Sequence, residues 1–211
     1  MTDNMSRTRF EEILLSTQRK GIENVLKELD NTDFFKAPAS SRFHLSCEGG
    51  LLKHSLNVYD AAMILREQAI RREPNLEPLL PLDSVAITTL LHDTCKSDIY
   101  KKATLSRRLA SGLWEKYSGY SVDYYDGIPL GHGEKSVIML LQLGLKLKKE
   151  EIVAIRWHMG AWDLSFQSFE QKTNISEAND RFPLASLLQA ADSLSTHLLE
   201  NDTPNPNPEK K

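Results

Sequence analysis

The sequence feature that most constrains this chain is LLHDTCK at residues 90–96, where an apolar segment runs directly into a histidine, an aspartate and a lysine. The imidazole of His92 and the carboxylate of Asp93 together suit a borderline divalent cation. The ammonium group of Lys96 suits an anionic substrate. Because a His-Asp pair also arises by chance, its meaning depends on where the other histidines lie.

The chain has six histidines, and several of them lie in distinctive local contexts. These contexts are GGLLKH at His54, HD at His92, GHGEKS at His132 and RWHMG at His158. Further along, Asp192 lies within the apolar helical pattern AADSLS. Imidazole and carboxylate side chains therefore recur in distinctive contexts along most of the chain.

Apolar side chains recur at helical spacing along most of the chain, which predicts a mainly helical fold. The expected helices span about residues 7–29 with an interruption at Gly21, 51–71, a segment leading to His92 and Asp93, 134–143, 150–159 and 183–198. Asp83 or Ser84 is a suitable N-cap for the helix that leads to His92. Aromatic residues and glycines between Ile99 and Pro129 predict a β-hairpin, and the polar segment 160–182 predicts an irregular connection.

The order His, His-Asp, His, His, Asp on a mostly helical chain resembles the HD superfamily of metal-dependent phosphohydrolases, over roughly residues 40–200. The GHGEKS and RWHMG motifs are similar to a stand-alone bacterial HD subgroup. The resemblance implies an all-α, HD-domain helical bundle with a small β-hairpin insertion near residues 100–128. We expect residues 1–200 to form a single HD domain and residues 201–211 to form a disordered C-terminal tail.

The resemblance also implies a ligand set. His54, His92, Asp93 and Asp192 would hold one metal ion, whereas taken singly the two histidines could be core residues satisfied by the backbone. Extra histidines at His132 and His158 imply a second metal ion, with Asp93 as the bridging carboxylate, or else contacts to the substrate phosphate. We expect two divalent ions, and imidazole and carboxylate ligands suit iron, manganese, zinc or nickel alike.

Three further residues are candidates for substrate binding. Lys96 matches the lysine of the superfamily's HDxxK pattern, so it would bind a phosphate oxygen or stabilise the leaving group; the alternative is a solvated lysine just past a helix end. Arg42 and His44 precede the His54 helix and are second-rank candidates for the substrate phosphate. His197, five residues after Asp192, is interpreted as structural.

Composition restricts the partners. The formal net charge is −3 with no strongly basic half, which predicts no extended nucleic-acid surface, although a short oligonucleotide in a cleft remains compatible. Two cysteines, a polar start and no apolar run of membrane-spanning length predict a cytoplasmic protein without membrane contact. A homodimer is compatible with the sequence.

The leading hypothesis is a metal-dependent phosphohydrolase that cleaves a phosphomonoester or phosphodiester of a small, nucleotide-like substrate. A metal-bound hydroxide would attack phosphorus, with Asp93 and Lys96 as the catalytic residues. One alternative is a 3′–5′ exoribonuclease-like HD nuclease, and another is a non-catalytic metal-binding regulatory module. The aromatic hairpin could stack on a base, but we favour the interpretation that it covers an edge of the core.

Overall fold

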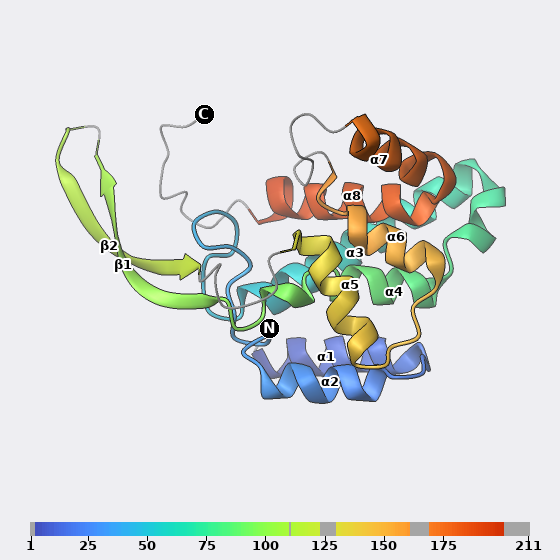
Figure 1. The fold of residues 1–211 in the computed structure, drawn as a ribbon, viewed down its shortest axis with the longest axis horizontal. Coiled ribbons are helices and arrows are strands. Elements are labelled where there is room, and N and C mark those ends of the chain that lie inside the picture. Colours follow the sequence, from blue (N-terminus) through green and yellow to red (C-terminus); the bar gives the residue numbers. More distant parts are fainter. Residues whose placement is uncertain (1–2, 110, 123–129, 161–168, 201–211) are drawn as a thin grey trace.

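The computed structural model of the chain describes residues 3–109, 111–122, 130–160 and 169–200. It is mostly helical with one two-stranded antiparallel hairpin, which confirms the predicted all-α class with a hairpin insertion (Figure 1). The elements are α1 (Asp3–Ser16), α2 (Ile22–Asn31), α3 (Gly50–Arg72), α4 (Leu82–Leu91), β1 (Tyr100–Arg108), β2 (Trp114–Val122), α5 (His132–Gln142), α6 (Lys149–Trp157), α7 (Phe169–Arg181) and α8 (Pro183–Leu194). Short turns of helix add η1 (Pro74–Leu79), η2 (Thr94–Lys96) and η4 (Ser195–Leu199).

The predicted interruption at Gly21 separates two helices. Gly21 has φ of 94°, a left-handed conformation that glycine adopts without steric cost. A Cβ atom there would also lie only 2.3 Å from the carbonyl oxygen of Gly144, so a side chain has no room. The turn between α1 and α2 is therefore locked against the loop that follows α5.

The helix α4 explains how polar residues reach the interior. All of its residues from Ser84 to Leu91 are buried, and Val85, Ile87, Leu90 and Leu91 have no exposed surface. A helix that is buried on every face needs other elements around it. It packs against α1, α3, α6 and α8, and the chain leaves it at His92 in the middle of the protein.

Two clusters of buried side chains form the core on either side of this helix. One joins α1 and α2 to the first half of α3 through Phe10, Leu14 and Leu51. The other joins the second half of α3 to α8 through Val58 and Leu188. Since α3 contributes to both clusters, it fixes the positions of the surrounding helices.

The structure corrects two expectations about helix boundaries. Neither Asp83 nor Ser84 caps α4, because the carbonyl group of Pro81 accepts the first backbone N–H bonds and Asp83 instead pairs with Arg19 and Lys148. Part of the segment predicted as irregular is the helix α7, which packs against α6 and α8. Its polar composition concealed it, since only Ala178 among its described side chains is buried.

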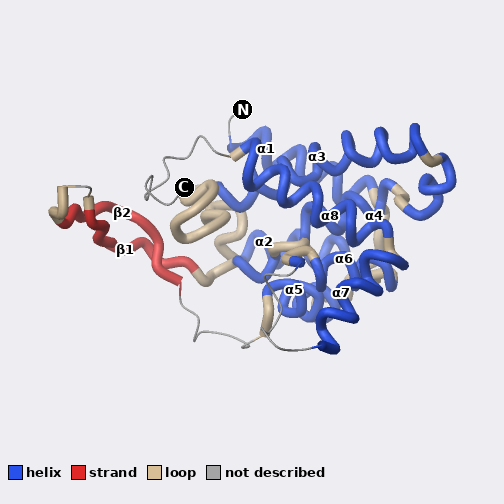
Figure 2. The backbone as a smooth tube through the Cα atoms, turned by 90° about the horizontal axis from the view of Figure 1, so that it is seen from above, coloured by secondary structure: helices blue, strands red, loops and turns tan. Residues whose placement is uncertain are grey.

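The hairpin pairs Tyr100 with Val122 at its base and Arg108 with Trp114 near its tip. In two views at right angles it projects away from the helical body (Figure 1, Figure 2). Tyr100 packs against the core, as the edge-covering interpretation requires, but Trp114 is 72% exposed. Only the base of the hairpin therefore covers the core.

Three predicted segments lie partly or wholly outside the described residues: the C-terminal tail at 201–211, the hairpin at 123–128 and the irregular connection at 161–168. Within the described ranges, no helix combines the length and apolar character needed to cross a membrane.

Candidate metal centre

Five of the six predicted metal ligands converge on one buried centre from four parts of the fold. His54 lies in the second turn of α3, His92 and Asp93 follow α4, His158 follows α6, and Asp192 lies near the end of α8. The residue exposures are 1% for His54, 0% for His92, 2% for Asp93 and 3% for His158. Titratable side chains are seldom buried so completely unless they are paired or bind a metal.

Asp93 lies at the middle of this cluster. Its Oδ2 atom is 3.3 Å from Nε2 of His92 and 3.7 Å from Nε2 of His54, and its Oδ1 atom is 3.5 Å from Nε2 of His158. Asp192 contacts the same cluster, with Oδ1 3.3 Å from Nε2 of His54. One carboxylate therefore faces three imidazoles.

Two of the histidines are oriented by the helix that each one ends. His92 and His158 are the C-caps of α4 and α6. Nδ1 of His92 lies 2.8 Å from the carbonyl oxygen of Thr89, and Nδ1 of His158 lies 2.7 Å from that of Ile155. Each Nδ1–H group therefore donates to its helix, and each Nε2 lone pair points into the centre, the tautomer that a metal requires.

Three atoms in the centre have no hydrogen-bond partner within the described part of the chain. They are Nε2 of His92, Nε2 of His158 and Oδ1 of Asp93, and all are buried. An unsatisfied buried polar atom costs about 1–3 kcal/mol, so such a set needs an explanation. Cations bound by the ligand groups of this centre would give these atoms partners.

The spacing of the ligand atoms also fits a cation. One group contains His54, His92 and Asp93, another contains His92, His158 and Asp192, and the atoms within each group lie within 4.8 Å of one another. Nitrogen and carboxylate oxygen donors of this kind suit divalent transition metals. These buried groups could therefore hold a metal ion.

His132, the sixth predicted ligand, stands apart from these groups. It is the first residue of α5, after the N-cap Gly131, and it faces the same cavity as the centre. Its Nδ1 atom lies 3.9 Å from the sulfur of Cys95. Its position allows contact with a substrate or with a second ion farther out.

Lys96 is buried and paired, which excludes the alternative of a solvated lysine. Its Nζ atom lies 2.7 Å from Oδ2 of Asp93 and donates to the carbonyl oxygen of Ala39 at 2.9 Å. Burial would lower the pKa of Lys96, but Asp93 outweighs it and raises that pKa. Burial would likewise raise the pKa of Asp93, but Lys96 and His92 hold it well below its usual range.

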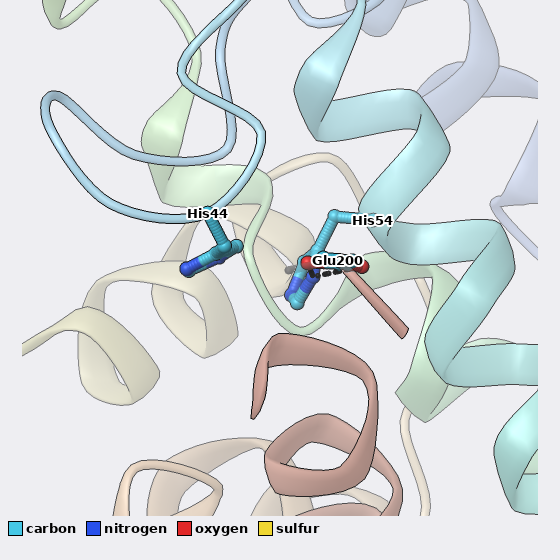
Figure 3. Close-up of side chains that lie close together, drawn as sticks. All are labelled: His44, His54 and Glu200. Atoms are coloured by element: carbon cyan, nitrogen blue, oxygen red, sulfur yellow. Dashed lines mark hydrogen bonds and ion pairs between the residues drawn. The ribbon is translucent and has the colours of Figure 1, made fainter. Parts of the chain in front are cut away.

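Glu200 is a member of the centre that the sequence did not reveal. Both of its carboxylate oxygens lie 3.1 Å from Nδ1 of His54, and Asn57 donates to one of them at 2.9 Å. Figure 3 shows Glu200 against His54, with His44 approaching from the preceding loop. Glu200 follows Leu198 and Leu199 and directly precedes the Pro- and Asn-rich segment 201–208, where a solvated residue would be expected.

The two carboxylates change the protonation of His54. Burial would lower its pKa, but hydrogen bonds to Asp192 and Glu200 raise it to about 9. The same contacts lower the pKa of Asp192 and of Glu200. Without a cation, the centre therefore holds a proton on His54 where a metal-loaded site would hold a metal.

His44 and Arg42, the two second-rank candidates, separate in the structure. Nε2 of His44 is buried, and its ring centre lies 4.9 Å from that of His54. Burial, with the charges of His54 and Lys96, lowers the pKa of His44 to about 4, so its imidazole is neutral. Arg42 is exposed and is absent from the described lining of the cavity.

A cavity of about 840 Å³ opens over the centre. Its floor includes His54, Asp93, Lys96, His158 and Asp192, and its walls include the base of the hairpin and the end of α8. His197, which the spacing from Asp192 led us to interpret as a structural residue away from the site, is exposed and lines this cavity. The π-helical turn η4 begins three residues after Asp192 and alters the helical spacing that supported that interpretation.

Comparisons of the chain with protein-family models, curated proteins and solved structures found no match. The fold and the site define a mainly helical protein with a buried histidine and aspartate centre that could hold a metal ion. Its function is therefore inferred from the chemistry of that centre.

Proposed function

We propose that the chain is a metal-dependent phosphohydrolase of the HD type, cleaving a phosphomonoester or phosphodiester of a nucleotide-like substrate. The observation that carries the proposal is the set of buried atoms without hydrogen-bond partners in the described structure, two imidazole nitrogens and one carboxylate oxygen, beside a cavity whose lining includes Asp93 and His158. A centre kept only for stability would satisfy those atoms with hydrogen bonds. Their arrangement instead favours a ligand.

His54, His92, Asp93, His158 and Asp192 would hold the metal. A divalent cation there would supply positive charge against phosphate oxygens and would lower the pKa of a water molecule, which are the two requirements of phosphate ester hydrolysis. Glu200 would act through His54 by holding its ring in place. Lys96 compensates the charge of the buried Asp93 and also lines the cavity. It would therefore contact the phosphate of a bound substrate as well.

The cavity suits a substrate of nucleotide size. Its volume of about 840 Å³ lies within the range of about 300–1,000 Å³ that small-molecule sites occupy. His44, neutral and half-buried, has an unpartnered Nε2 atom in the described structure and can form a hydrogen bond with a phosphate oxygen or hydroxyl group. Phe43 and Tyr100 line the same space and offer apolar surface for a base or sugar.

The experiment is metal reconstitution followed by a substrate screen. The protein is loaded with Mn²⁺, Fe²⁺, Zn²⁺ or Ni²⁺, its metal content is measured, and p-nitrophenyl phosphate, bis-p-nitrophenyl phosphate and common nucleotides are tested for hydrolysis. We expect Asp93→Ala to lose both metal and hydrolysis. Asp180→Ala, at an exposed position on α7, is the matched control and should lose neither.

Two outcomes would contradict the proposal. Full metal content in Asp93→Ala would place the metal elsewhere. Stable metal binding by the wild-type protein, with no hydrolysis of any tested ester, would favour the alternative of a metal-binding regulatory module.

A further inference from the structure

The formal charge of the chain is distributed unevenly. Residues 100–122, which form the hairpin, contain five lysines and arginines and a single glutamate, so they carry a formal charge of +4 in a chain whose total is −3. The helical body is therefore acidic and the projecting hairpin is basic. The expectation of no extended nucleic-acid surface rested on the total charge, which conceals this separation.

The strand register places most of this charge on one face of the hairpin. Paired residues of an antiparallel ladder project to the same side, and successive pairs alternate. The face that includes the Tyr100–Val122 pair is here called the basic face, and its members are Tyr100, Lys102, Thr104, Ser106, Arg108, Trp114, Lys116, Ser118, Tyr120 and Val122. It holds three cations, three aromatic rings and no carboxylate.

On the opposite face of the hairpin, the side chains pack against one another. Leu105 packs so closely over Gly119 that a Cβ atom there would lie 2.8 Å from its Cδ1 atom. The side chain of Arg107 lies over the ring of Tyr117 at 5.5 Å and pairs with Glu115 at 2.6 Å. That face therefore has a structural role, with its aromatic ring and its acid already engaged.

The basic face, by contrast, is open. Seven of its ten residues are exposed, including Lys102, Arg108, Lys116 and Trp114. Lys102 approaches Glu48 at 3.4 Å, but both side chains are solvent-exposed, so this pair is easily displaced. Figure 1 and Figure 2 show that the hairpin extends beyond the helical body, which leaves its outer part uncovered by helices.

The basic face is also continuous with the cavity. The pair at its base, Tyr100 and Val122, lines the same cavity as Lys96 and Asp93. One end of a linear polymer bound along the basic face would therefore lie at the candidate metal centre. This continuity distinguishes the face from a remote patch of surface charge.

We propose that the basic face binds single-stranded nucleic acid and directs one end of the strand into the cavity. This inference rests on the proposed function, because it names a polynucleotide as the substrate class of that site. Lysine and arginine would neutralise phosphates, while the exposed ring of Trp114 and the half-buried ring of Tyr120 would stack on bases. Nine residues of β1 span about 27 Å, enough for roughly eight stacked nucleotides.

A single strand fits this face better than a duplex. The cations form one narrow row along a two-stranded ribbon, and the aromatic rings need unpaired bases on which to stack. The base of the face ends at the cavity over the candidate metal centre, where the end of one strand would enter. An anionic membrane or a duplex would interact with the cations, but it would neither stack on the aromatic rings nor place a strand end in the cavity.

The test is fluorescence anisotropy with a fluorescein-labelled oligouridylate of about ten nucleotides, in EDTA so that binding is measured without hydrolysis. Arg108→Ala/Lys116→Ala should weaken binding at least tenfold and reduce the slope of log affinity against log salt by about 1.4, or 0.7 per lost phosphate contact. Trp114→Ala should weaken binding about tenfold. The matched control is Lys101→Ala, which removes an exposed charge from the opposite face of the same strand and should change affinity less than about twofold.

Three results would overturn the inference. They are absence of single-strand binding at low salt, equal losses in Lys101→Ala and the basic-face variants, and stronger binding to duplex or to phosphatidylserine vesicles than to the single strand. Because the assay contains no metal, its outcome is independent of hydrolysis. Binding that follows the expected pattern in a protein that hydrolyses no phosphate ester would sustain the binding face and reject the proposed function.

Discussion

The carboxylate of Glu200 holds the imidazole of His54 from behind, with both oxygens 3.1 Å from Nδ1. This contact directs Nε2 of His54 toward Asp192 and Asp93. A carboxylate behind a metal-ligating histidine fixes its tautomer and makes it a better ligand. Glu200 is therefore a positioning residue of the proposed centre.

Replacing Glu200 by glutamine should weaken metal affinity about 10–100-fold, because an amide keeps the shape but loses the charge behind His54. Competition with a chelating dye would measure it. Glu177→Gln, at an exposed glutamate on α7, is the control. Unchanged affinity in a folded Glu200→Gln protein would show that the contact serves stability alone.

Replacing Lys96 by alanine should leave metal bound and lower turnover by about 10²–10³, the loss typical of one charge-stabilising group. Its side chain faces both Asp93 and the cavity, so part of the loss will come from the uncompensated charge of Asp93. Turnover and metal content should be measured on the same sample. Lys53→Ala, exposed and next to His54 in the sequence, is the control, and wild-type turnover in Lys96→Ala would remove the lysine from the mechanism.

The reconstituted protein should bind about two divalent ions per chain, the arrangement common in phosphate-cleaving centres. His132 lies outside the compact ligand groups, so it would serve the outer ion. We expect His132→Ala to retain about one ion. Elemental analysis decides this, and a single ion in the wild-type protein would reject the dinuclear form while leaving the inner site intact.

The stabilisation of the protein by metal should increase with pH. The raised pKa of His54, about 9 against an ordinary 6.5, stabilises the metal-free fold fully below about pH 6.5, and this contribution is lost as pH rises through about 9. A metal ion must displace that proton, so its apparent affinity falls by up to about tenfold per pH unit below 9. Thermal unfolding with and without Mn²⁺ should show the two melting temperatures diverging from pH 6.5 to 9. A constant difference would contradict the assignment of the proton to the ligand site.

Arg19 and Glu151 should be important for stability at a distance from the centre. The guanidinium group of Arg19 contacts both oxygens of the fully buried Glu151 at 2.6 and 2.8 Å. Removing one partner of a buried pair leaves the charge of the other buried and unpaired, so Arg19→Ala should destabilise the protein by about 3–5 kcal/mol. Urea denaturation measures this, with Glu67→Ala in an exposed pair as a control expected below about 1 kcal/mol. A cost below about 1 kcal/mol for Arg19→Ala would mean that water replaces the partner.

The ligands could be predicted from the sequence because each has a local signature. His92 and His158 end helices, and His54 follows a glycine pair at the start of one. The spacing of apolar residues therefore predicted the position of each histidine along its helix. That five of these side chains meet follows from the packing of α4 between α3, α6 and α8. The apolar pattern of the sequence indicated that α4 is buried, but it could not give the distances between the ligand atoms.

What could not be predicted depends on contacts between distant segments. Glu200 and His54 lie in different helical segments, and nothing in the local sequence of Glu200 distinguishes a buried glutamate from a solvated one. The helix α7 was missed because its polar residues carry almost no apolar period. The two faces of the hairpin required the strand register, which the sequence alone left open.

The position of Glu200 has a consequence for biosynthesis. The centre draws on the chain from Ala39, which fixes Lys96, to Glu200, which fixes His54. A nascent chain cannot complete the site until residue 200 has left the ribosome. The proposed metal would therefore be bound late in synthesis, and a translation product that ends before residue 200 would lack the carboxylate behind His54.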